Sequence, residues 1–462
     1  MSKYMRRWSS SLTIAFALVC FGFSPAFATG TLSWNSDQQK VSADLKSEDL
    51  LKVLERIATT THWHVYVEPD ALHPVSAKFK NLPPGEALHL LFGDLNFALI
   101  PEANSKSRLY VFRTSRGNAT QLIQPSASAK DAGKPRIIPN ELIVRLKPGA
   151  KIEDIAKLLG AKVVGRIENL NAYRLQFADQ QAADAARTQL ANNPDVGAVE
   201  NNYVIDRPEA VQGVQAGAPP LQLQLKPPPP GGRPIIGLID TAVQPLGSDL
   251  DSVLLKQLSV AGDAQLDPNS PSHGTSMAET MIRTLQTLGD GKTTWQILPI
   301  DAFGSNEEAN TFDIALAIAL AVSKGANPIN LSLGSSSDSQ VLSDVIAQGV
   351  KNNIVFYGAK GNTPVDTPFY PAADPGVTAV TALDANGNVV SWANQAPIPA
   401  IGARGSVLIP FGNQTWVVQG TSPAAAIATA TTASLMEQYS ITATAANAQL
   451  LKNPTPTTLP GK

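Results

Sequence analysis

From Pro234 to the end of the chain, short apolar runs alternate with longer segments of helical periodicity, and this alternation limits the possible fold more than any other feature. Runs of strand length lie at residues 235–239, 295–300, 329–333, 354–357 and 377–382. Helical segments lie at residues 273–288, 313–322, 341–350, 423–437 and 445–451. Strands that alternate with helices predict a parallel sheet covered by helices on both faces. We therefore expect a doubly wound, mostly parallel α/β domain over residues 234–462.

Four polar residues fall where the carboxyl edge of such a sheet would gather them. Asp240 ends the first strand, His273 opens a helix, Asn362 follows a strand and Ser422 opens the long final helix. A serine hydroxyl becomes a good nucleophile only when a base takes its proton and an acid orients that base. His273 is the only histidine after His89, so it is the only imidazole available to this domain. The pattern indicates acyl-transfer chemistry, with the Ser422 backbone N–H at a helix N-terminus and the Asn362 amide as donors to an oxyanion.

The segments around these residues resemble those of subtilisin-like serine proteases. The matching segments, in family order, are IIGLIDTAV, SHGTSMA, NPINLSLG, GAKGN and GTSPAAA. The resemblance implies a serine endopeptidase acting on protein or peptide substrates, with Asp240, His273 and Ser422 as its triad and Asn362 as oxyanion donor. It also implies five substrate-binding residues: Ser332, Leu333, Gly334, Ala359 and Gly361. Of these, Ser332 to Gly334 would form a strand that pairs with the substrate backbone.

Departures from the family pattern keep other hypotheses open. Ala242 stands where the family usually has Gly, which matters if that backbone needs a positive φ. Glu279, Lys360 and Pro423 also replace typical residues. One alternative is a catalytically degenerate protease fold that serves as a binding scaffold in the cell envelope. Another is an esterase on a similar sheet, although the segment around Ser422 lacks the G-x-S-x-G elbow of those enzymes.

The N-terminus has the pattern of a secretory signal peptide over residues 1–28. Basic residues precede an apolar run at residues 12–23, and small residues follow at Ala26 and Ala28. The run is shorter than the roughly 20 residues that a spanning helix needs, and no later stretch qualifies, so we expect no membrane span in the mature chain. We expect export to the periplasm or the extracellular space; twin-arginine export and lipidation of Cys20 are minor alternatives. Because Cys20 is the only cysteine, the mature chain should contain no disulfide.

Residues 38–115 show a strand–helix–strand pattern twice, which predicts a small α+β domain. Ser47 is expected to cap the first helix, in which Leu50, Leu51, Leu54 and Ile57 share one face. The phrases VSADLKSEDLLKVLERIATTTHWHVYVEPD and VSAKFKNLPPGEALHLLFGDLNFALI resemble the short N-terminal domain of secretins and TonB-dependent receptors. That resemblance implies docking to an envelope or secretion-system protein.

A metal site in this first block is a weaker hypothesis. Its histidines are His62, His64, His73 and His89. Surface histidines on a strand are the commoner outcome, because no Cys or Asp-rich cluster accompanies them. We expect no metal and no cofactor, and the sequence does not show whether calcium binds at the surface.

Residues 136–206 predict a second α+β domain of order βαββαβ, which is the order of a ferredoxin-like fold. The phrases PNELIVRLKPGAKIEDIAKLLGA and NNPDVGAVENNYV resemble the inhibitory prodomain of subtilisin-like proteases. Residues 207–233 contain four consecutive prolines and two glycines, so we expect an extended, semi-rigid linker, with maturation cleavage inside it as a hypothesis.

The formal net charge of the chain is only −2, which excludes nucleic-acid binding driven by bulk positive charge. The charge is unevenly spread, because residues 234–462 carry nine Lys and Arg against 17 Asp and Glu. A basic front half and an acidic back half could attract each other, although solvated surfaces explain such a split equally well.

Overall fold

A computed structural model describes residues 31–35, 40–61, 63–68, 73–100, 107–114, 116, 119, 121–123, 134–208, 212–214, 220–412 and 414–452. The predicted signal peptide, Cys20 and His62 lie outside the described residues. None of the described helices is long and apolar enough to cross a membrane.

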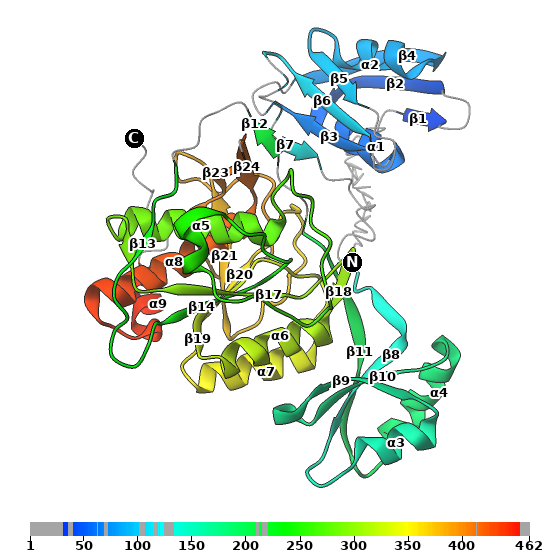
Figure 1. Cartoon of the computed structure of the whole chain (residues 1–462). Coiled ribbons are helices and arrows are strands. Elements are labelled where there is room, and N and C mark those ends of the chain that lie inside the picture. The colour runs from blue at the N-terminus through cyan, green and yellow to red at the C-terminus, as the bar shows by residue number, and fades with distance from the viewer. Residues whose placement is uncertain are drawn as a thin grey trace, which may run out of the picture.

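The described residues of the first block form two small sheets and two helices, and Figure 1 shows this block beside the ribbon that contains β12 (Gln212–Val214) and β24 (Gln414–Gln419). One sheet has the order β1-β2-β4, the other β5-β6-β3-β7. The elements are β1 (Thr31–Asn35), β2 (Lys40–Asp49), α1 (Leu50–Thr61), β3 (His64–Val67), β4 (Pro74–Leu82), α2 (Pro84–Phe92), β5 (Asn96–Ile100), β6 (Arg108–Phe112) and β7 (Gln121–Ile123). Helix α1 buries three of the four residues of its predicted apolar face, Leu50, Leu54 and Ile57, in the core of this block. Leu51 is only partly buried, and Val53 is fully buried in its place.

The expectation that Ser47 caps the first helix is wrong. Strand β2 continues through Ser47, whose backbone N–H donates to Oγ of Ser76 on β4 at 2.8 Å. The Asp49 carboxylate instead accepts from the N–H of Leu51 at 2.8 Å. Cross-strand pairing with β4 therefore extends the strand past the predicted cap, and an acidic residue nearer the helix satisfies its first turn.

The second block is ferredoxin-like, as predicted. Its strands lie in the order β11-β8-β10-β9 and every neighbouring pair is antiparallel. The elements are β8 (Ile137–Leu146), α3 (Ile152–Leu159), β9 (Lys162–Ile167), the 3₁₀ turn η3 (Glu168–Leu170), β10 (Ala172–Gln176), α4 (Gln180–Ala191) and β11 (Val196–Asp206).

The third block confirms the doubly wound α/β fold. Its seven-stranded sheet is parallel throughout and has the order β15-β17-β14-β19-β20-β21-β22. The strands are β14 (Ile235–Asp240), β15 (Leu258–Ser259), β17 (Gln296–Asp301), β19 (Ala326–Leu331), β20 (Phe356–Ala359), β21 (Val377–Leu383) and β22 (Ala400–Arg404). Short runs of β-branched and aliphatic residues suit these strands, because both faces of the sheet are covered.

Helices cover the two faces of this sheet in separate layers (Figure 1). The first layer packs in one core cluster and the second in another. The first layer contains α5 (His273–Leu288) and α8 (Thr421–Tyr439); the second contains α6 (Thr311–Ser323) and α7 (Gln340–Lys351). Helix α9 (Ala443–Lys452) packs on α8, and an antiparallel ribbon is formed by β23 (Ser406–Phe411), β24 (Gln414–Gln419) and β12 (Gln212–Val214).

The second half of the predicted linker is not a spacer. Leu223 is buried in the core that contains α5 and α8, and β13 (Gln224–Leu225) pairs in parallel with β16 (Lys292–Thr293). Lys226 forms an ion pair with Glu437 at 2.7 Å. The short alternation around Leu223 is therefore a strand of the third block, and the proline run follows it as a surface turn.

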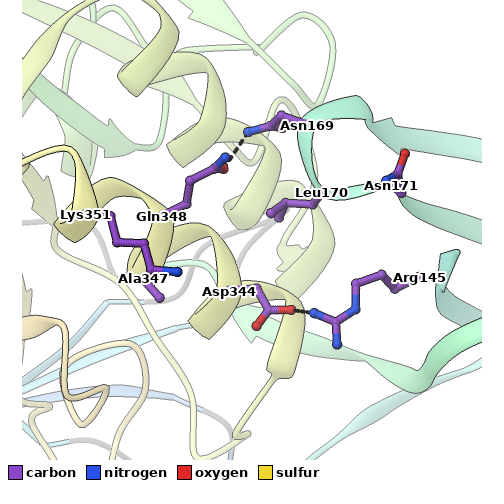
Figure 2. A pocket seen from close by; sticks show the side chains of 8 residues that line it. All are labelled: Arg145, Asn169, Leu170, Asn171, Asp344, Ala347, Gln348 and Lys351. Atoms are coloured by element: carbon purple, nitrogen blue, oxygen red, sulfur yellow. Dashed lines mark hydrogen bonds and ion pairs between the residues drawn. The ribbon is translucent and has the colours of Figure 1, made fainter. Parts of the chain in front are cut away.

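The ferredoxin-like block lies against α6 and α7. Strand β11 adds the short strand β18 (Glu308–Asn310) to its edge, and Arg174 forms an ion pair with Asp313 on α6 at 3.0 Å. Figure 2 shows the crevice beside α7, in which Arg145 pairs with Asp344 and Asn169 bonds to Gln348. Ion pairs, a side-chain hydrogen bond and an added strand therefore join the two blocks.

The carboxylate of Glu200 makes several hydrogen bonds across the interface between the second and third blocks. Its carboxylate accepts from the backbone N–H groups of Gln340 at 2.9 Å and Val341 at 2.7 Å, and from the Ser339 hydroxyl at 3.2 Å. These donors form the first turn of α7, where unpaired N–H groups and the helix dipole favour a negative charge. Burial raises the pKa of Glu200, and the three hydrogen bonds oppose that rise.

Candidate active site

The four residues predicted to be catalytic lie at the ends of helices and strands, or just after them, at the carboxyl edge of the parallel sheet. Asp240 is the last residue of β14 and His273 is the first residue of α5. Asn362 follows β20 by three residues, and Ser422 is the second residue of α8. Helix α8 packs against α5, β19 and β20, which brings its first turn near the loops after those strands.

Asp240 and His273 form a buried pair. Nδ1 of His273 lies 2.8 Å from Oδ1 and 3.0 Å from Oδ2 of Asp240. Asp240 is fully buried and His273 is 8% exposed, so water competes little for this contact. Since the carboxylate holds Nδ1, the other ring nitrogen of His273 is left to exchange a proton.

The sequence around His273 explains how its helix comes so near to β14. The N-cap residue Ser272 accepts from the N–H of Thr275 at 3.0 Å, and its hydroxyl donates to the carbonyl of Ala242 at 2.6 Å. A Cβ on Gly274 would lie 2.0 Å from the carbonyl oxygen of Thr241. Only glycine permits this close approach of α5 to the end of β14.

Ser422 is held at the start of α8 by an exchange of hydrogen bonds with Ser332. The Ser422 hydroxyl donates to the carbonyl of Ser332 at 3.3 Å, and the Ser332 hydroxyl donates to the carbonyl of Ser422 at 3.1 Å. Within the part of the chain that the structure describes, no hydrogen bond joins Ser422 to His273. The geometry therefore contains the Asp240–His273 contact of a relay, with the serine hydroxyl turned toward the neighbouring loop.

Asn362 is fixed by one end of its amide. Its Oδ1 accepts from the backbone N–H of Thr421 at 2.8 Å and from the Thr421 hydroxyl at 2.9 Å. The same hydroxyl accepts from the N–H of Gly361 at 3.0 Å. Among the described residues Nδ2 has no acceptor, so it is free to donate to a ligand beside Ser422. Thr421 was not among the residues predicted from the sequence, although its place directly before the predicted nucleophile was a signal.

The five predicted substrate-binding residues lie after two neighbouring strands. Ser332, Leu333 and Gly334 follow β19, while Ala359 ends β20 and Gly361 follows it with φ +107°. Regular pairing within the sheet ends at Leu331, and residues 332–334, which were predicted to pair with the substrate backbone, continue from the end of β19. The side chains of Ser332 and Leu333 are buried, which leaves only their backbone for a ligand.

The four departures from the family pattern have distinct structural settings. Ala242 is buried and its φ is not positive, so the alanine causes no strain there. Burial raises the pKa of Glu279 to about 8, although Arg283 opposes the shift, and burial lowers the pKa of Lys360. Pro423 lies in the first turn of α8, where no intrahelical N–H is needed.

No group of three or more His, Cys, Asp or Glu side chains is arranged to hold a metal ion within the described ranges. Among the first-block histidines, His89 packs edge to face on Phe97 at a centroid distance of 4.8 Å.

Comparisons with known proteins fit this geometry. Residues 231–459 match the model of the subtilase family, and residues 123–202 match that of the fervidolysin N-terminal prodomain. A thermophilic serine proteinase of Bacillus sp. (strain AK1) is 27% identical over 303 residues, which cover 62% of this chain and 75% of that protein. A thermostable alkaline protease of Halalkalibacterium halodurans is 32% identical over 180 residues, which cover 36% of this chain and 49% of the relative.

Solved structures show the same fold. Fervidolysin from Fervidobacterium pennivorans, described as a keratinolytic enzyme related to subtilisin, superposes with a TM-score of 0.52 at 20% identity. The match covers 65% of this chain and 55% of fervidolysin. The epidermin leader peptide processing serine protease of Staphylococcus aureus gives a TM-score of 0.52 at 16% identity, over 68% of this chain and 91% of its own. The likeness of residues 38–115 to secretin and TonB modules stays a prediction.

Proposed function

The chain carries a subtilase domain preceded by a fervidolysin-like prodomain, which makes it a subtilisin-like serine endopeptidase, and from this premise we propose that Asp240, His273 and Ser422 are its catalytic triad. The observation that carries the proposal is the contact of both Asp240 carboxylate oxygens with Nδ1 of His273. A buried acid that fixes one imidazole tautomer is what a histidine base needs in order to activate a serine.

The reaction follows from these groups. The Ser422 hydroxyl turns from the Ser332 carbonyl to Nε2 of His273, gives up its proton there and attacks the scissile carbonyl. The carbonyl oxygen becomes an oxyanion, to which Nδ2 of Asn362 and the backbone N–H of Ser422 donate. His273 then gives its proton to the leaving amine, and an acyl-enzyme on Ser422 remains. Water, deprotonated by His273, hydrolyses this ester.

The ferredoxin-like block supports a second part of the proposal. We propose that the protein is made as a precursor whose prodomain assists folding of α6 and α7 and occupies the cleft until the chain is cut. The Glu200 contacts with the first turn of α7, and the ion pair between Arg174 and Asp313, support this role. Uncut Ser422→Ala precursor should accumulate, whereas equal processing of both forms would show that another protease makes the cut.

We further propose that the signal peptide at residues 1–28 directs export to the periplasm or the extracellular space, and that residues 38–115 dock to an envelope or secretion-system protein. Mass spectrometry of the secreted protein identifies the mature N-terminus. A start near residue 29, or further along after precursor cleavage, is expected, whereas an intact Met1 would contradict export through this leader.

A fluorophosphonate probe tests the catalytic proposal directly. Wild-type protein should be labelled at Ser422, and Ser422→Ala should not be labelled. Ser434→Ala removes another buried serine from the same helix and is the matched control, since it should label like wild type. Labelling that persists in Ser422→Ala, or its absence in processed wild type, would disprove the assignment.

A further inference from the structure

Two loops with glycines leave the carboxyl ends of neighbouring strands. Strands β19 and β20 are parallel partners in which Leu331 lies opposite Gly358. Beyond this pair, one loop reaches Gly334 and the other reaches Gly361. The Ser422 hydroxyl donates to the carbonyl of Ser332 at the base of the first loop, so the space between the two loops lies beside the proposed nucleophile.

The ring of Phe369 already lies between the two glycines. A Cβ built on Gly334 would lie 2.7 Å from Cε1 and 3.0 Å from Cδ1 of Phe369. A Cβ built on Gly361 would lie 3.3 Å from Cγ and 3.4 Å from Cδ1 of the same ring. These distances are shorter than ordinary carbon contacts of about 3.5–4.0 Å, so the ring packs directly on both glycine backbones.

The backbone around Phe369 is anchored on both sides. Tyr370 exchanges two hydrogen bonds with Ser335 in the first loop, at 2.7 and 2.9 Å. The carbonyl of Phe369 accepts from the N–H of Ala373 at 2.9 Å. Asn394 donates to the carbonyls of Gly361 at 3.0 Å and Thr367 at 2.9 Å. The segment that carries Phe369 is thereby tied to both loops, and the ring cannot leave by a shift of its backbone alone.

We propose that Phe369 fills the slot between Gly334 and Gly361 and restricts the residue on the N-terminal side of the cleaved bond to small side chains. This inference rests on the proposed function and adds its substrate class: peptides with Gly, Ala or Ser at that position. A large aromatic or aliphatic side chain would overlap the ring, and overpacking a filled site is unfavourable.

Peptidyl phosphonate esters, which modify an activated serine covalently, test this directly on the full chain. Three probes share one peptide and carry Ala, Phe or Asp at the position before the phosphorus. Wild type should react with the Ala probe about tenfold or more faster than with the Phe probe, since even one methylene in a specificity pocket changes rates by about that factor. Phe369→Gly should reverse this preference. Phe369→Leu leaves part of the slot filled and should fall between the two.

Tyr439→Ala is the matched control, because it removes an exposed aromatic ring from α8 without touching the slot, and its preference should equal that of wild type. If Phe369→Gly does not fold, the proposal is still tested by the preference of wild type and of Phe369→Leu between the Ala and Phe probes. Faster reaction of wild type with the Phe probe would overturn the proposal. A preference for the Asp probe would also overturn it, and would assign specificity to Lys360.

A fluorophosphonate without a peptide separates the two proposals. If it labels Ser422 while the peptide probes show no preference for Ala, the inference about Phe369 alone is wrong. If it labels neither wild type nor Phe369→Gly, the proposed function is wrong and this inference falls with it.

Discussion

Both carboxylate oxygens of Asp240 lie within hydrogen-bond distance of Nδ1 of His273, at 2.8 and 3.0 Å. The neighbouring strand β17 places another acid, Asp301, directly opposite Asp240, yet among the described residues no hydrogen bond joins Asp301 to His273. Its Oδ1 accepts from the N–H groups of Phe303 and Gly304 instead. Two buried acids at one level of the sheet therefore have different partners.

Asp240→Asn should lower kcat by about 10⁴-fold, because the amide no longer fixes the productive tautomer of His273. Asp301→Asn is a matched control, since its Oδ1 can still accept both N–H groups, and it should retain wild-type activity. The measurement is steady-state hydrolysis of a chromogenic peptide. Equal losses in both variants would argue against a special role for Asp240.

Asn362→Asp should lower kcat by about 10²–10³-fold with little change in KM, because the oxyanion loses a donor. The substitution keeps Oδ1, which accepts from Thr421, so the loop after β20 should keep its anchor. Asn362→Ala tests whether the added charge contributes to the loss. A kcat within tenfold of wild type for both variants would remove Asn362 from the mechanism.

Glu279→Gln should remove a pH dependence of stability. The pKa of Glu279 is about 8 in the folded protein, against a usual value of 4.5. A raised folded-state pKa stabilises the fold below pH 4.5, and this contribution is lost as the pH rises toward 8. At pH 7 the neutral variant should be more stable by about 3 kcal/mol.

Urea unfolding at pH 5 and pH 8 measures this effect, with the exposed Glu307→Gln as control. The difference in unfolding free energy between Glu279→Gln and wild type should grow with pH. Parallel pH profiles would show that Glu279 ionises equally well in the folded and unfolded chain.

Leu223→Ala should destabilise the catalytic domain by about 2–5 kcal/mol, because it leaves a cavity in the core beside α5 and α8. The exposed Val389→Ala should change stability by no more than about 0.5 kcal/mol. Urea unfolding followed by hydrogen exchange in α5 reports on this domain. Unchanged protection of the α5 amides in Leu223→Ala would indicate that residues 223–225 act only as a spacer.

Glu200→Ala should weaken the docking of the prodomain by about 1–3 kcal/mol, because three donors at the start of α7, two of them on the buried residues Ser339 and Val341, lose their acceptor. Hydrogen exchange of the Gln340 and Val341 amides in the full chain should become faster. Glu153→Ala breaks an exposed ion pair with Arg166 within the prodomain and should leave these amides unchanged. Unaltered exchange of these amides in Glu200→Ala would show that the Glu200 hydrogen bonds do not stabilise the docking of the prodomain.

Much of the fold was predictable because the signals are local. The strand–helix alternation predicted the parallel sheet, and the order of Asp240, His273, Asn362 and Ser422 at element ends predicted which edge would gather them. The ferredoxin-like order was equally local. Where a local signal failed, a distant partner had changed the outcome: β4 extended β2 past the predicted cap, and β16 paired with β13 in the segment that had been expected to be a linker.

The amino-acid sequence alone determined the elements, their order and the chemical groups at their ends, because periodicity, caps and glycines act over a few residues. Only the tertiary structure decided which groups touch: Asp240 rather than Asp301 on His273, Thr421 on Asn362, and the ring of Phe369 between Gly334 and Gly361. Those contacts join residues far apart in the chain, and their distances follow from how helices and loops pack on the sheet, which no short pattern encodes.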